Sequence, residues 1–281
     1  MNDAAPPRRI WLCADDYGLA EGVNRAIRDL IGRSRLNATS VMVVGAAIGR
    51  AEVAALQEVA AASPRCAIGL HATLTAPFRP LTMHFRPVDG GLFLPFPKLL
   101  RAGLLRRLDS EMIEDELAAQ LAVFKDLFGR APDFVDGHQH AQLFPGVRDA
   151  FLRAVKEAAP SAWVRQGGRL KPLGQLLSEP KALVLDVLSA QFRKRAVHAK
   201  IPFNPVFAGA YDFSKEPDFG VLMRQFLEGL PEGGLVMCHP GFVDETLEGL
   251  DPLTTQREAE HAFLASDRFP TLLAANKVTL S

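Results

Sequence analysis

The sequence of 281 residues has little cysteine, little tryptophan or tyrosine, and no excess charge of either sign. Its three cysteines are too few and too widely spaced for a disulfide framework or a cysteine-based zinc site. Lys plus Arg and Asp plus Glu both number 32, so the chain as a whole has no field that attracts nucleic acid or a membrane. We therefore expect a reduced, cytoplasmic protein that does not bind nucleic acid.

The sequence also lacks the apolar runs of membrane proteins. It contains no stretch of about 18 apolar residues, the length that spans a bilayer. Residues 1–9 are polar and contain two prolines, unlike a signal peptide. Hydrophobic residues make up 48% of the chain and charged residues 23%, a balance typical of globular proteins. We expect residues 1–281 to form a single domain.

Short apolar runs alternate with longer amphipathic ones along the chain. This alternation predicts a mostly parallel α/β sheet, either open or closed into a barrel. The expected strands are residues 10–14, 39–44, 66–70, 134–136, 163–165, 235–238 and 277–280. The expected helices are residues 21–31, 50–62, 111–128, 147–158, 222–230 and 255–265. Two proline-rich stretches, residues 77–97 and 200–217, are expected to be long loops.

Polar side chains follow the predicted strands at the points where the strands end. Asp15 and Asp16 follow the first strand and His71 the third, whereas His138 and His239 follow the strands at 134–136 and 235–238. The carboxyl ends of parallel strands converge on one face of an α/β fold, where active sites form. We therefore expect these residues to lie together, although they are distant in the sequence.

Each of these features also has a structural interpretation. Asp15 and Asp16 could cap the helix that follows them, and His71 alone could be a hydrogen-bonded core residue. His239 could simply belong to the turn at its strand end. Cys238, next to it, raises a thiol nucleophile as a rival, but adjacent strand residues point in opposite directions.

The segment Asp136-Gly137-His138-Gln139-His140 is a stronger signal. Imidazoles two residues apart in an extended segment point to the same side, and a nearby carboxylate can orient a ligating imidazole. A carboxylate and two imidazoles suit Zn²⁺, Mn²⁺, Co²⁺ or Fe²⁺, and Mg²⁺ less well. Such an ion, a carboxylate base and an imidazole acid together can hydrolyse an amide. His84, His198 and His261 have no such context and are expected to be surface or core residues.

Five segments, taken in order, resemble the YdjC-like deacetylase family, which includes chitooligosaccharide deacetylases and hopanoid-associated deacetylases. They span residues 10–242, most of the chain. The segments are Ala14-Asp15-Asp16-Tyr17-Gly18 with Gly22-Val23-Asn24, Thr39-Ser40-Val41-Met42-Val43, Gly69-Leu70-His71-Ala72-Thr73-Leu74-Thr75, Asp136-Gly137-His138-Gln139-His140 with Phe144-Pro145, and Cys238-His239-Pro240-Gly241.

The resemblance implies a deformed TIM-like (β/α) barrel, with long loops over the active-site face, that removes an N-acetyl group from an amino sugar. It implies one divalent ion, with zinc or magnesium as first candidates, bound by Asp16, His71 and His138. It also implies that Asp15 is the catalytic base and His239 the general acid. We expect three further residues to contact the substrate: His140, Gln142 and Arg165. Gln142 departs from the family, in which a third histidine often stands at that position.

Residues 166–215 match no segment of the family and are expected to form a divergent, lid-like region. Residues 98–107 and 181–200 are rich in both leucine and basic residues. They are expected either to be ordinary helices with a solvated basic face or to contact an anionic membrane that presents a lipid-linked sugar. In the second case the enzyme would be peripheral at the inner membrane face.

The leading hypothesis is therefore a metal-dependent carbohydrate N-deacetylase whose substrate is an N-acetylated sugar or sugar lipid. A homodimer is a further possibility. One rival is a carbohydrate-binding or regulatory protein that kept the pocket but lost catalysis; an intact Asp15 speaks against it. Another is a different metal hydrolase or phosphodiesterase on a similar barrel. A phosphate-cleaving site more often holds two metals, whereas the sequence offers ligands for one.

Overall fold

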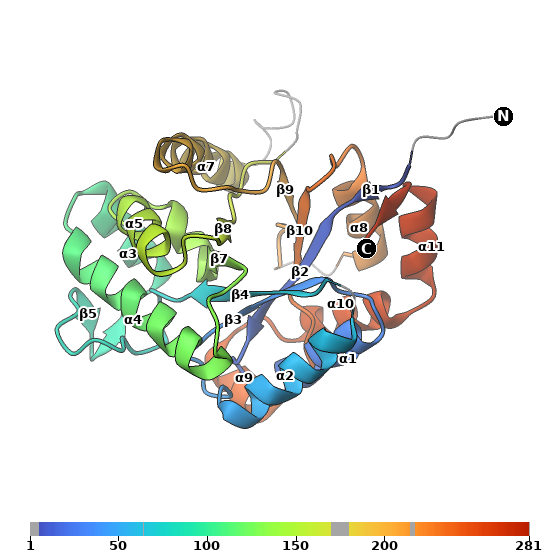
Figure 1. The fold of residues 1–281 in the computed structure, drawn as a ribbon, viewed down its shortest axis with the longest axis horizontal. Helices are drawn as coiled ribbons and strands as arrows, with labels where there is room; N and C mark the ends of the chain where they lie inside the picture. The colour runs from blue at the N-terminus through green and yellow to red at the C-terminus, as the bar shows by residue number, and fades with distance from the viewer. Residues whose placement is uncertain (1–5, 64, 170–179, 214–216, 281) are drawn as a thin grey trace.

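A curled sheet of seven strands forms the centre of the protein (Figure 1). The computed structural model describes residues 6–63, 65–169, 180–213 and 217–280. The strands lie in the order β8-β7-β4-β3-β2-β10-β9, and every neighbouring pair is parallel. Their bounds are β2 (Trp11–Tyr17), β3 (Ala38–Val41), β4 (Ala67–Ala72), β7 (Phe134–Gly137), β8 (Trp163–Val164), β9 (Phe207–Ala208) and β10 (Leu235–Cys238).

Helices surround the sheet, as expected for parallel strands joined by crossover connections. They are α1 (Glu21–Gly32), α2 (Arg50–Ala62), α3 (Phe96–Leu104), α4 (Ser110–Phe128), α5 (Arg148–Ala158), α7 (Pro180–Ala199), α8 (Phe219–Leu227), α9 (Glu245–Leu250), α10 (Thr255–Ala265) and α11 (Arg268–Ala275), with a short 3₁₀ segment η1 (His138–Leu143). The long helix α4 shows how local sequence sets the bounds. The Asp109 side chain caps its first turn, and Gly129, at φ 68°, ends it in the left-handed conformation.

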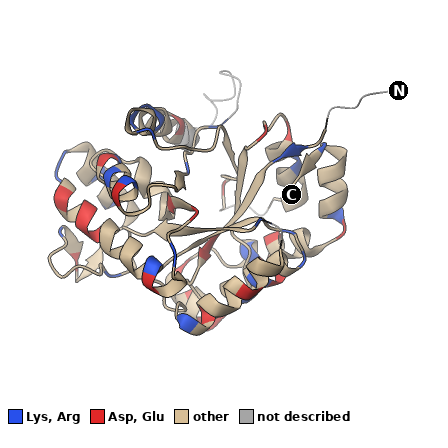
Figure 2. Cartoon of the chain, viewed as in Figure 1, with Lys and Arg blue, Asp and Glu red and all other residues tan. Residues whose placement is uncertain are grey.

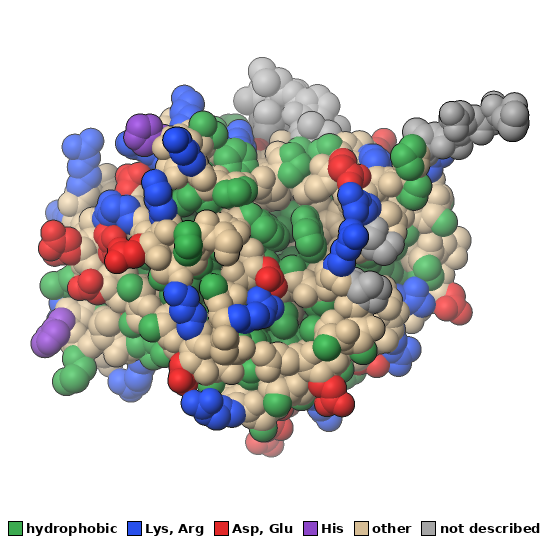
Figure 3. All heavy atoms as spheres, viewed as in Figure 1, with side chains coloured by type: hydrophobic (Ala, Val, Ile, Leu, Met, Phe, Trp, Pro, Cys, Tyr) green, Lys and Arg blue, Asp and Glu red, His purple; other side chains and the backbone are tan. Residues whose placement is uncertain are grey.

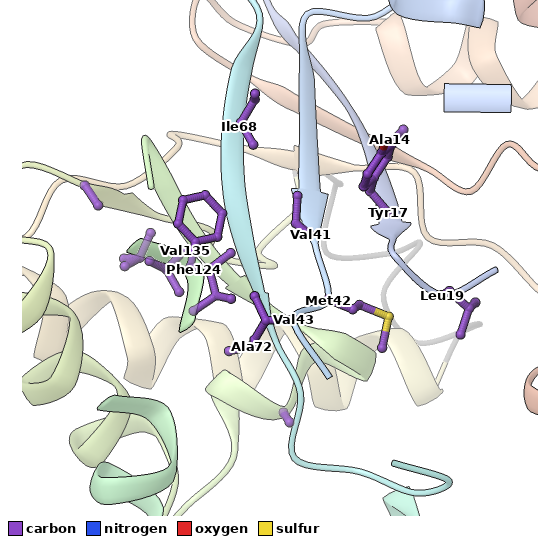
Figure 4. Close-up of a cluster of buried hydrophobic side chains, with 14 of the residues drawn as sticks. Ala14, Tyr17, Leu19, Val41, Met42, Val43, Ile68, Ala72, Phe124 and Val135 are labelled. Atoms are coloured by element: carbon purple, nitrogen blue, oxygen red, sulfur yellow. The ribbon is translucent and has the colours of Figure 1, made fainter. Parts of the chain in front are cut away.

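Alternation along the strands produces two separate apolar clusters. The outer cluster lies between sheet and helices and contains Ala14, Val41, Ile68 and Val135 (Figure 4). A smaller cluster takes the alternate strand positions and fills the concave side: Cys13, Ala38, Ala67, Phe134, Phe207, Leu235 and Met237. Because successive strand residues point to opposite faces, these two clusters fix which side chains enter the barrel.

The expected parallel α/β architecture and deformed barrel are confirmed. The edge strands β8 and β9 do not pair directly, but Phe207 N donates to Gly168 O at 2.9 Å and Val164 N to Pro202 O at 2.9 Å. These bonds join the two edges through irregular backbone. The predicted strand at residues 277–280 appears as β11 (Val278–Thr279), which pairs with β1 (Arg8–Arg9) outside the main sheet.

Two predicted loops contain regular structure. Residues 77–97 include the hairpin β5 (Val88–Asp89) and β6 (Leu92–Phe93) and the start of α3, whereas residues 200–217 include β9. Strands of two residues are too short to show an alternating pattern, so the sequence did not reveal them. Within the lid-like region, residues 170–179 and 214–215 lie outside the described residues. Its lid role and the single-domain assignment stay predictions.

Basic and acidic residues are mixed along the helices rather than separated (Figure 2). The face shown in Figure 3 likewise carries Lys, Arg, Asp and Glu side chains interspersed among apolar ones. None of the described helices is both long and apolar enough to cross a membrane.

Candidate functional site

The site residues continue the inward-facing rows of the barrel. In β2, Asp15 lies two residues beyond the inward-facing Cys13, and in β7, Asp136 lies two residues beyond Phe134. The same step of two leads from Met237 to His239, from Trp163 to Arg165 and, through Gly69, from Ala67 to His71. Polar side chains therefore replace apolar ones at the carboxyl end of the barrel, where the sequence predicted that they would meet.

Asp16 breaks this alternation, because a regular strand would point it away from Asp15. The pairing of β2 with β3 shifts register between Ala14 and Tyr17, and Asp16 has a φ of 71°. A non-glycine residue with positive φ is uncommon and marks functional sites when the surrounding structure holds it there. The bulge brings both carboxylates to one site. The capping interpretation is wrong, since the N-cap of α1 is Ala20.

Asp16, His71 and His138 form a compact buried group. Asp16 Oδ1 lies 3.3 Å from His71 Nε2 and 3.2 Å from His138 Nδ1. One ligand atom from each residue lies within 4.8 Å of the other two. The Phe78 ring packs edge-on against the His138 ring, with centroids 5.8 Å apart. Two imidazole nitrogens and one carboxylate oxygen facing one another are a donor set suited to a divalent transition metal.

A second carboxylate orients His71. Asp136 Oδ1 lies 2.6 Å and Ser40 Oγ 3.0 Å from His71 Nδ1, which leaves Nε2 facing Asp16. Carboxylates commonly hold metal-binding imidazoles in this way. Burial alone would lower the pKa of His71, but Asp136 and Asp15 outweigh it and raise the pKa to about 10. The surroundings thus favour positive charge at this point. Sequence reasoning had paired Asp136 with His138, its near neighbour, rather than with His71.

Arg165 lies beneath these carboxylates. Its Nη1 is 2.7 Å from Asp15 Oδ2 and its Nη2 is 2.5 Å from Asp15 Oδ1, while Nη2 also contacts Asp136 Oδ2. Burial alone would raise the pKa of Asp15, but the charge of Arg165 outweighs it and lowers the pKa to about 2. Arg165 is only 1% exposed and is not among the residues that line the cavity. These contacts support a positioning role for Arg165, and its predicted substrate contact stays a prediction.

A second arginine, which sequence reasoning missed, holds Asp16. Arg257 on α10 donates from Nη2 to Asp16 Oδ2 and to Asp251 Oδ2, each at 2.7 Å, and it is 0% exposed. Burial alone would lower the pKa of Arg257, but Asp16 and Asp251 raise it, so the guanidinium stays charged. No sequence pattern distinguished it from a surface arginine on an amphipathic helix.

His239 follows β10 at the wall of the same cavity. Its backbone N donates to Glu260 Oε2 at 2.5 Å, and its ring packs edge-on against Phe213 with centroids 5.5 Å apart. Nδ1 is buried and has no partner among the described residues. Burial lowers the pKa of His239, and the charges of Asp16 and Asp15 offset that only in part.

The other two predicted substrate contacts differ in position. His140, at φ 57°, lines the cavity, and burial together with the charge of Arg165 lowers its pKa to about 3, so its imidazole is neutral. Gln142 is 2% exposed and does not line the cavity; its Nε2 donates to Arg165 O at 3.3 Å. Gln142 thus lies behind the residues that line the cavity, whereas the exposed Gln139, which had no predicted role, lines it.

These groups surround a cavity of about 490 Å³. Its lining includes three aspartates, four histidines and Arg257. It also includes the apolar side chains of Phe213, Met237, Pro252 and Leu253. A mainly apolar cleft with a few convergent polar groups is the usual form of a small-molecule site. Apolar surface of this kind suits the carbon face of a sugar ring or a short acyl chain.

The alternative nucleophile and the remaining histidines lie elsewhere. Burial raises the pKa of the Cys238 thiol, and its Sγ lies 3.5 Å from Cys13 O on the neighbouring strand. A buried neutral thiol is a poor nucleophile. His261 Nε2 is 2.9 Å from Asp29 Oδ2, and His84 and His198 are exposed.

Comparisons with known proteins match most of this chain. A family described as "YdjC-like protein" matches residues 9–275. A protein of Escherichia fergusonii named chitooligosaccharide deacetylase is 28% identical over 250 residues, which cover 85% of this chain and 84% of that protein.

Solved structures share the fold. A putative cellobiose-phosphate cleavage protein from Enterococcus faecalis matches with a TM-score of 0.76 and 18% identity, covering 98% of this chain and 97% of the other. A lactam utilization protein from Thermus thermophilus matches with a TM-score of 0.52 and 15% identity, covering 97% and 98%. At these identities, the two structures support the curled barrel alone.

Proposed function

Because the chain belongs to the YdjC-like family, we propose that it removes the N-acetyl group of an amino sugar by metal-dependent hydrolysis. At the level of class, the family match and the chitooligosaccharide deacetylase relative identify a carbohydrate deacetylase. The metal and the residue roles are the finer proposal. One observation carries it: three ligand-type residues and a separate buried carboxylate, Asp15, line one cavity.

Asp16, His71 and His138 would hold the ion. Their donor atoms already face one another within 4.8 Å, and the orienting bond from Asp136 to His71 Nδ1 leaves Nε2 available as a ligand. When bound, a divalent ion supplies a Lewis acid that polarises the amide carbonyl.

Proton transfer falls to Asp15 and His239. Asp15 stays ionised across the working pH range because Arg165 lowers its pKa to about 2, so it is always ready to accept a proton from the attacking water. The same low pKa makes it a modest base, which limits its contribution. His239 lines the same cavity and, once protonated, would donate that proton to the departing nitrogen and return to the neutral form that its lowered pKa favours. The products are a carboxylate and an amine.

A two-metal phosphodiesterase is less well supported. A second group of ligand-type residues exists, formed by Cys13, Asp15 and Asp136. The guanidinium of Arg165 contacts all three of these side chains and takes the place that a second cation would need. The described residues therefore supply one metal site, which favours amide hydrolysis over two-metal phosphoryl chemistry.

Mass spectrometry of a panel of N-acetylated sugars would test the activity. The purified protein should carry about one divalent ion per chain and release acetate from at least one amino sugar. Asp15→Asn should remove most of the release, whereas His84→Ala, an exposed histidine away from the cavity, should not change it. Binding of a sugar without any release of acetate would favour the non-catalytic carbohydrate-binding alternative.

We further propose that a lipid-linked amino sugar is one substrate. Residues 96–108 contain four basic residues and no acidic one, and three of their apolar side chains are exposed: Phe96 (38%), Leu104 (61%) and Leu105 (49%). α3 packs on the segment after η1, because Phe96 and Phe144 have ring centroids 5.4 Å apart. Basic residues beside exposed leucines suit an anionic bilayer.

The second predicted stretch supports this less. On α7, Phe192 and Ala196 are buried, whereas Val184 and Val187 are about half exposed, so its apolar side chains do not form one exposed face. Sedimentation with anionic and with neutral liposomes would separate the interpretations. Membrane contact would be supported if the protein binds anionic vesicles and Arg106→Glu weakens that binding. If the protein does not bind vesicles at low salt and is active on soluble N-acetylglucosamine oligomers, α3 and α7 are ordinary helices with a solvated basic face.

A further inference from the structure

Arg257 is fixed more firmly than a charge-balancing residue needs to be. Its Nη2 donates to Asp16 and to Asp251, and its Nε donates to Leu253 O at 3.0 Å. The side chain is 0% exposed. Three bonds from two nitrogens define the plane of the guanidinium, so the direction of the third nitrogen, Nη1, is fixed as well.

That third nitrogen has no acceptor among the described residues. Buried polar groups in native proteins are nearly always hydrogen-bonded, and an exception calls for an explanation. Arg257 lines the cavity that also contains Asp15, Asp16 and His239. Because the described residues supply no acceptor and Arg257 lines the cavity, a ligand that fills the cavity is the source of an acceptor for Nη1 that they leave open.

The chemistry of that acceptor follows from its neighbours. A guanidinium can only donate hydrogen bonds, and it donates most strongly to anionic oxygen. Nη1 belongs to the same group that holds Asp16, whose other oxygen faces the two imidazoles. The acceptor thus lies next to the reacting centre, where the acyl oxygen and then the carboxylate product would be, rather than at the more distant sugar hydroxyls.

We propose that Arg257 binds an oxygen of the acyl group, and of the carboxylate product, through Nη1 while Nη2 positions Asp16. The inference rests on the proposed function for the identity of the ligand. Because Nη2 occupies Asp16 Oδ2, only Oδ1 remains directed at His71 and His138. One residue thereby serves both the ligand set and the substrate.

Acetate is the probe that tests this, because its binding can be titrated without turnover. Arg257→Met removes both functions and should weaken acetate binding to the metal-loaded protein by about tenfold or more, the scale of one charged hydrogen bond. It should also lower metal affinity by roughly 10- to 100-fold, as loss of an orienting partner does. Metal affinity is measured by competition with a chelator.

Arg257→Lys separates the two functions and guards against a folding defect. A lysine ammonium can still pair with Asp16 but offers no second fixed nitrogen, so metal affinity should be largely kept while acetate affinity falls. Arg268→Met, on the neighbouring α11 with a side chain 69% exposed, is the matched control and should change neither.

Acetate binding that is equal in all three variants and in the unchanged protein would overturn the proposal, as would a failure of the unchanged protein to bind acetate. The outcome is distinguishable from failure of the proposed function. If the protein deacetylates a sugar but the Arg257 variants bind acetate as well as the unchanged protein, only this inference is wrong. If acetate binding depends on Arg257 but no sugar releases acetate, only the deacetylase assignment is wrong.

Discussion

Glu260 should make the stability of this protein depend on pH in an unusual direction. Its carboxylate is 1% exposed and accepts hydrogen bonds from His239 N and from Tyr211 Oη, the latter at 2.8 Å. Burial raises its pKa from 4.5 to about 7, and those two hydrogen bonds offset burial only in part. The folded state therefore binds this proton more tightly than the unfolded chain does.

The sign and the size follow from linkage. A carboxyl whose folded pKa is raised stabilises the fold fully below pH 4.5, and this stabilisation is lost as the pH rises through about 7. The shift of about 2.5 units corresponds to roughly 3 kcal/mol, at 1.36 kcal/mol per unit. Glu260→Gln removes the titration and keeps an acceptor for His239 N, while the Tyr211 hydroxyl can accept from the new amide.

Urea unfolding of both proteins at pH 5 and pH 8.5 measures the effect. Other groups titrate equally in both proteins. The difference in free energy of unfolding between the two proteins is therefore taken at each pH, and its change from pH 5 to pH 8.5 reports Glu260. At pH 5 the unfolded carboxyl is already mostly ionised, so we expect Glu260→Gln to gain about 2.5 kcal/mol on the unchanged protein between pH 5 and pH 8.5. Glu258→Gln, an exposed position on the same helix, should gain almost nothing. A Glu260→Gln difference that is the same at both pH values would refute the reasoning.

Three further outcomes are expected. Asp15→Asn should lower kcat by a factor of about 100 to 10,000, while the metal content per chain, measured by inductively coupled plasma emission spectroscopy, should stay the same. Normal turnover would mean that another residue is the base. Arg165→Met removes the guanidinium that contacts Asp15 and Asp136, leaves Asp15 without its cationic partner, and should cost roughly 3–5 kcal/mol in urea unfolding. Arg153→Met, at a half-exposed ion pair with Glu114, should cost under about 1 kcal/mol, and equal losses would contradict the buried-pair argument. Removal of the metal by a chelator should lower Tm and abolish activity, and added Zn²⁺ or Mg²⁺ should restore both. If the free metal concentration is 100 times its Kd, chelation should lower the free energy of unfolding by about 2.7 kcal/mol. An unchanged Tm would speak against a resident ion.

The sequence predicted the parts of this site that follow from strand periodicity. A strand fixes the direction of every second side chain, and parallel strands end at one edge, so strand ends alone were enough to bring His71 and His138 together. Asp16 was found next to Asp15 in the sequence, but the bulge that turns both to one side was not visible, because a shift of register depends on the partner strand β3.

Contacts made from helices or from deep in the barrel were not predicted. Arg257 comes from α10, and its direction depends on the packing of that helix rather than on any local pattern. Arg165 was found at its strand end, but its contacts with Asp15 and Asp136 were not predicted, because the sequence gives no measure of depth. It continues the inward row from Trp163, which places it under the carboxylates rather than above them.

The charges of these residues balance one another across the site. Four carboxylates, Asp15, Asp16, Asp136 and Asp251, contact two buried guanidiniums, Arg165 and Arg257. The guanidiniums compensate two of the four negative charges, and the two that remain favour a cation, in line with the raised pKa of His71. A divalent ion would balance those two charges while His71 stays neutral as a ligand. Removing either arginine would leave excess negative charge at the site, which opposes the negative charge that develops on oxygen during amide hydrolysis.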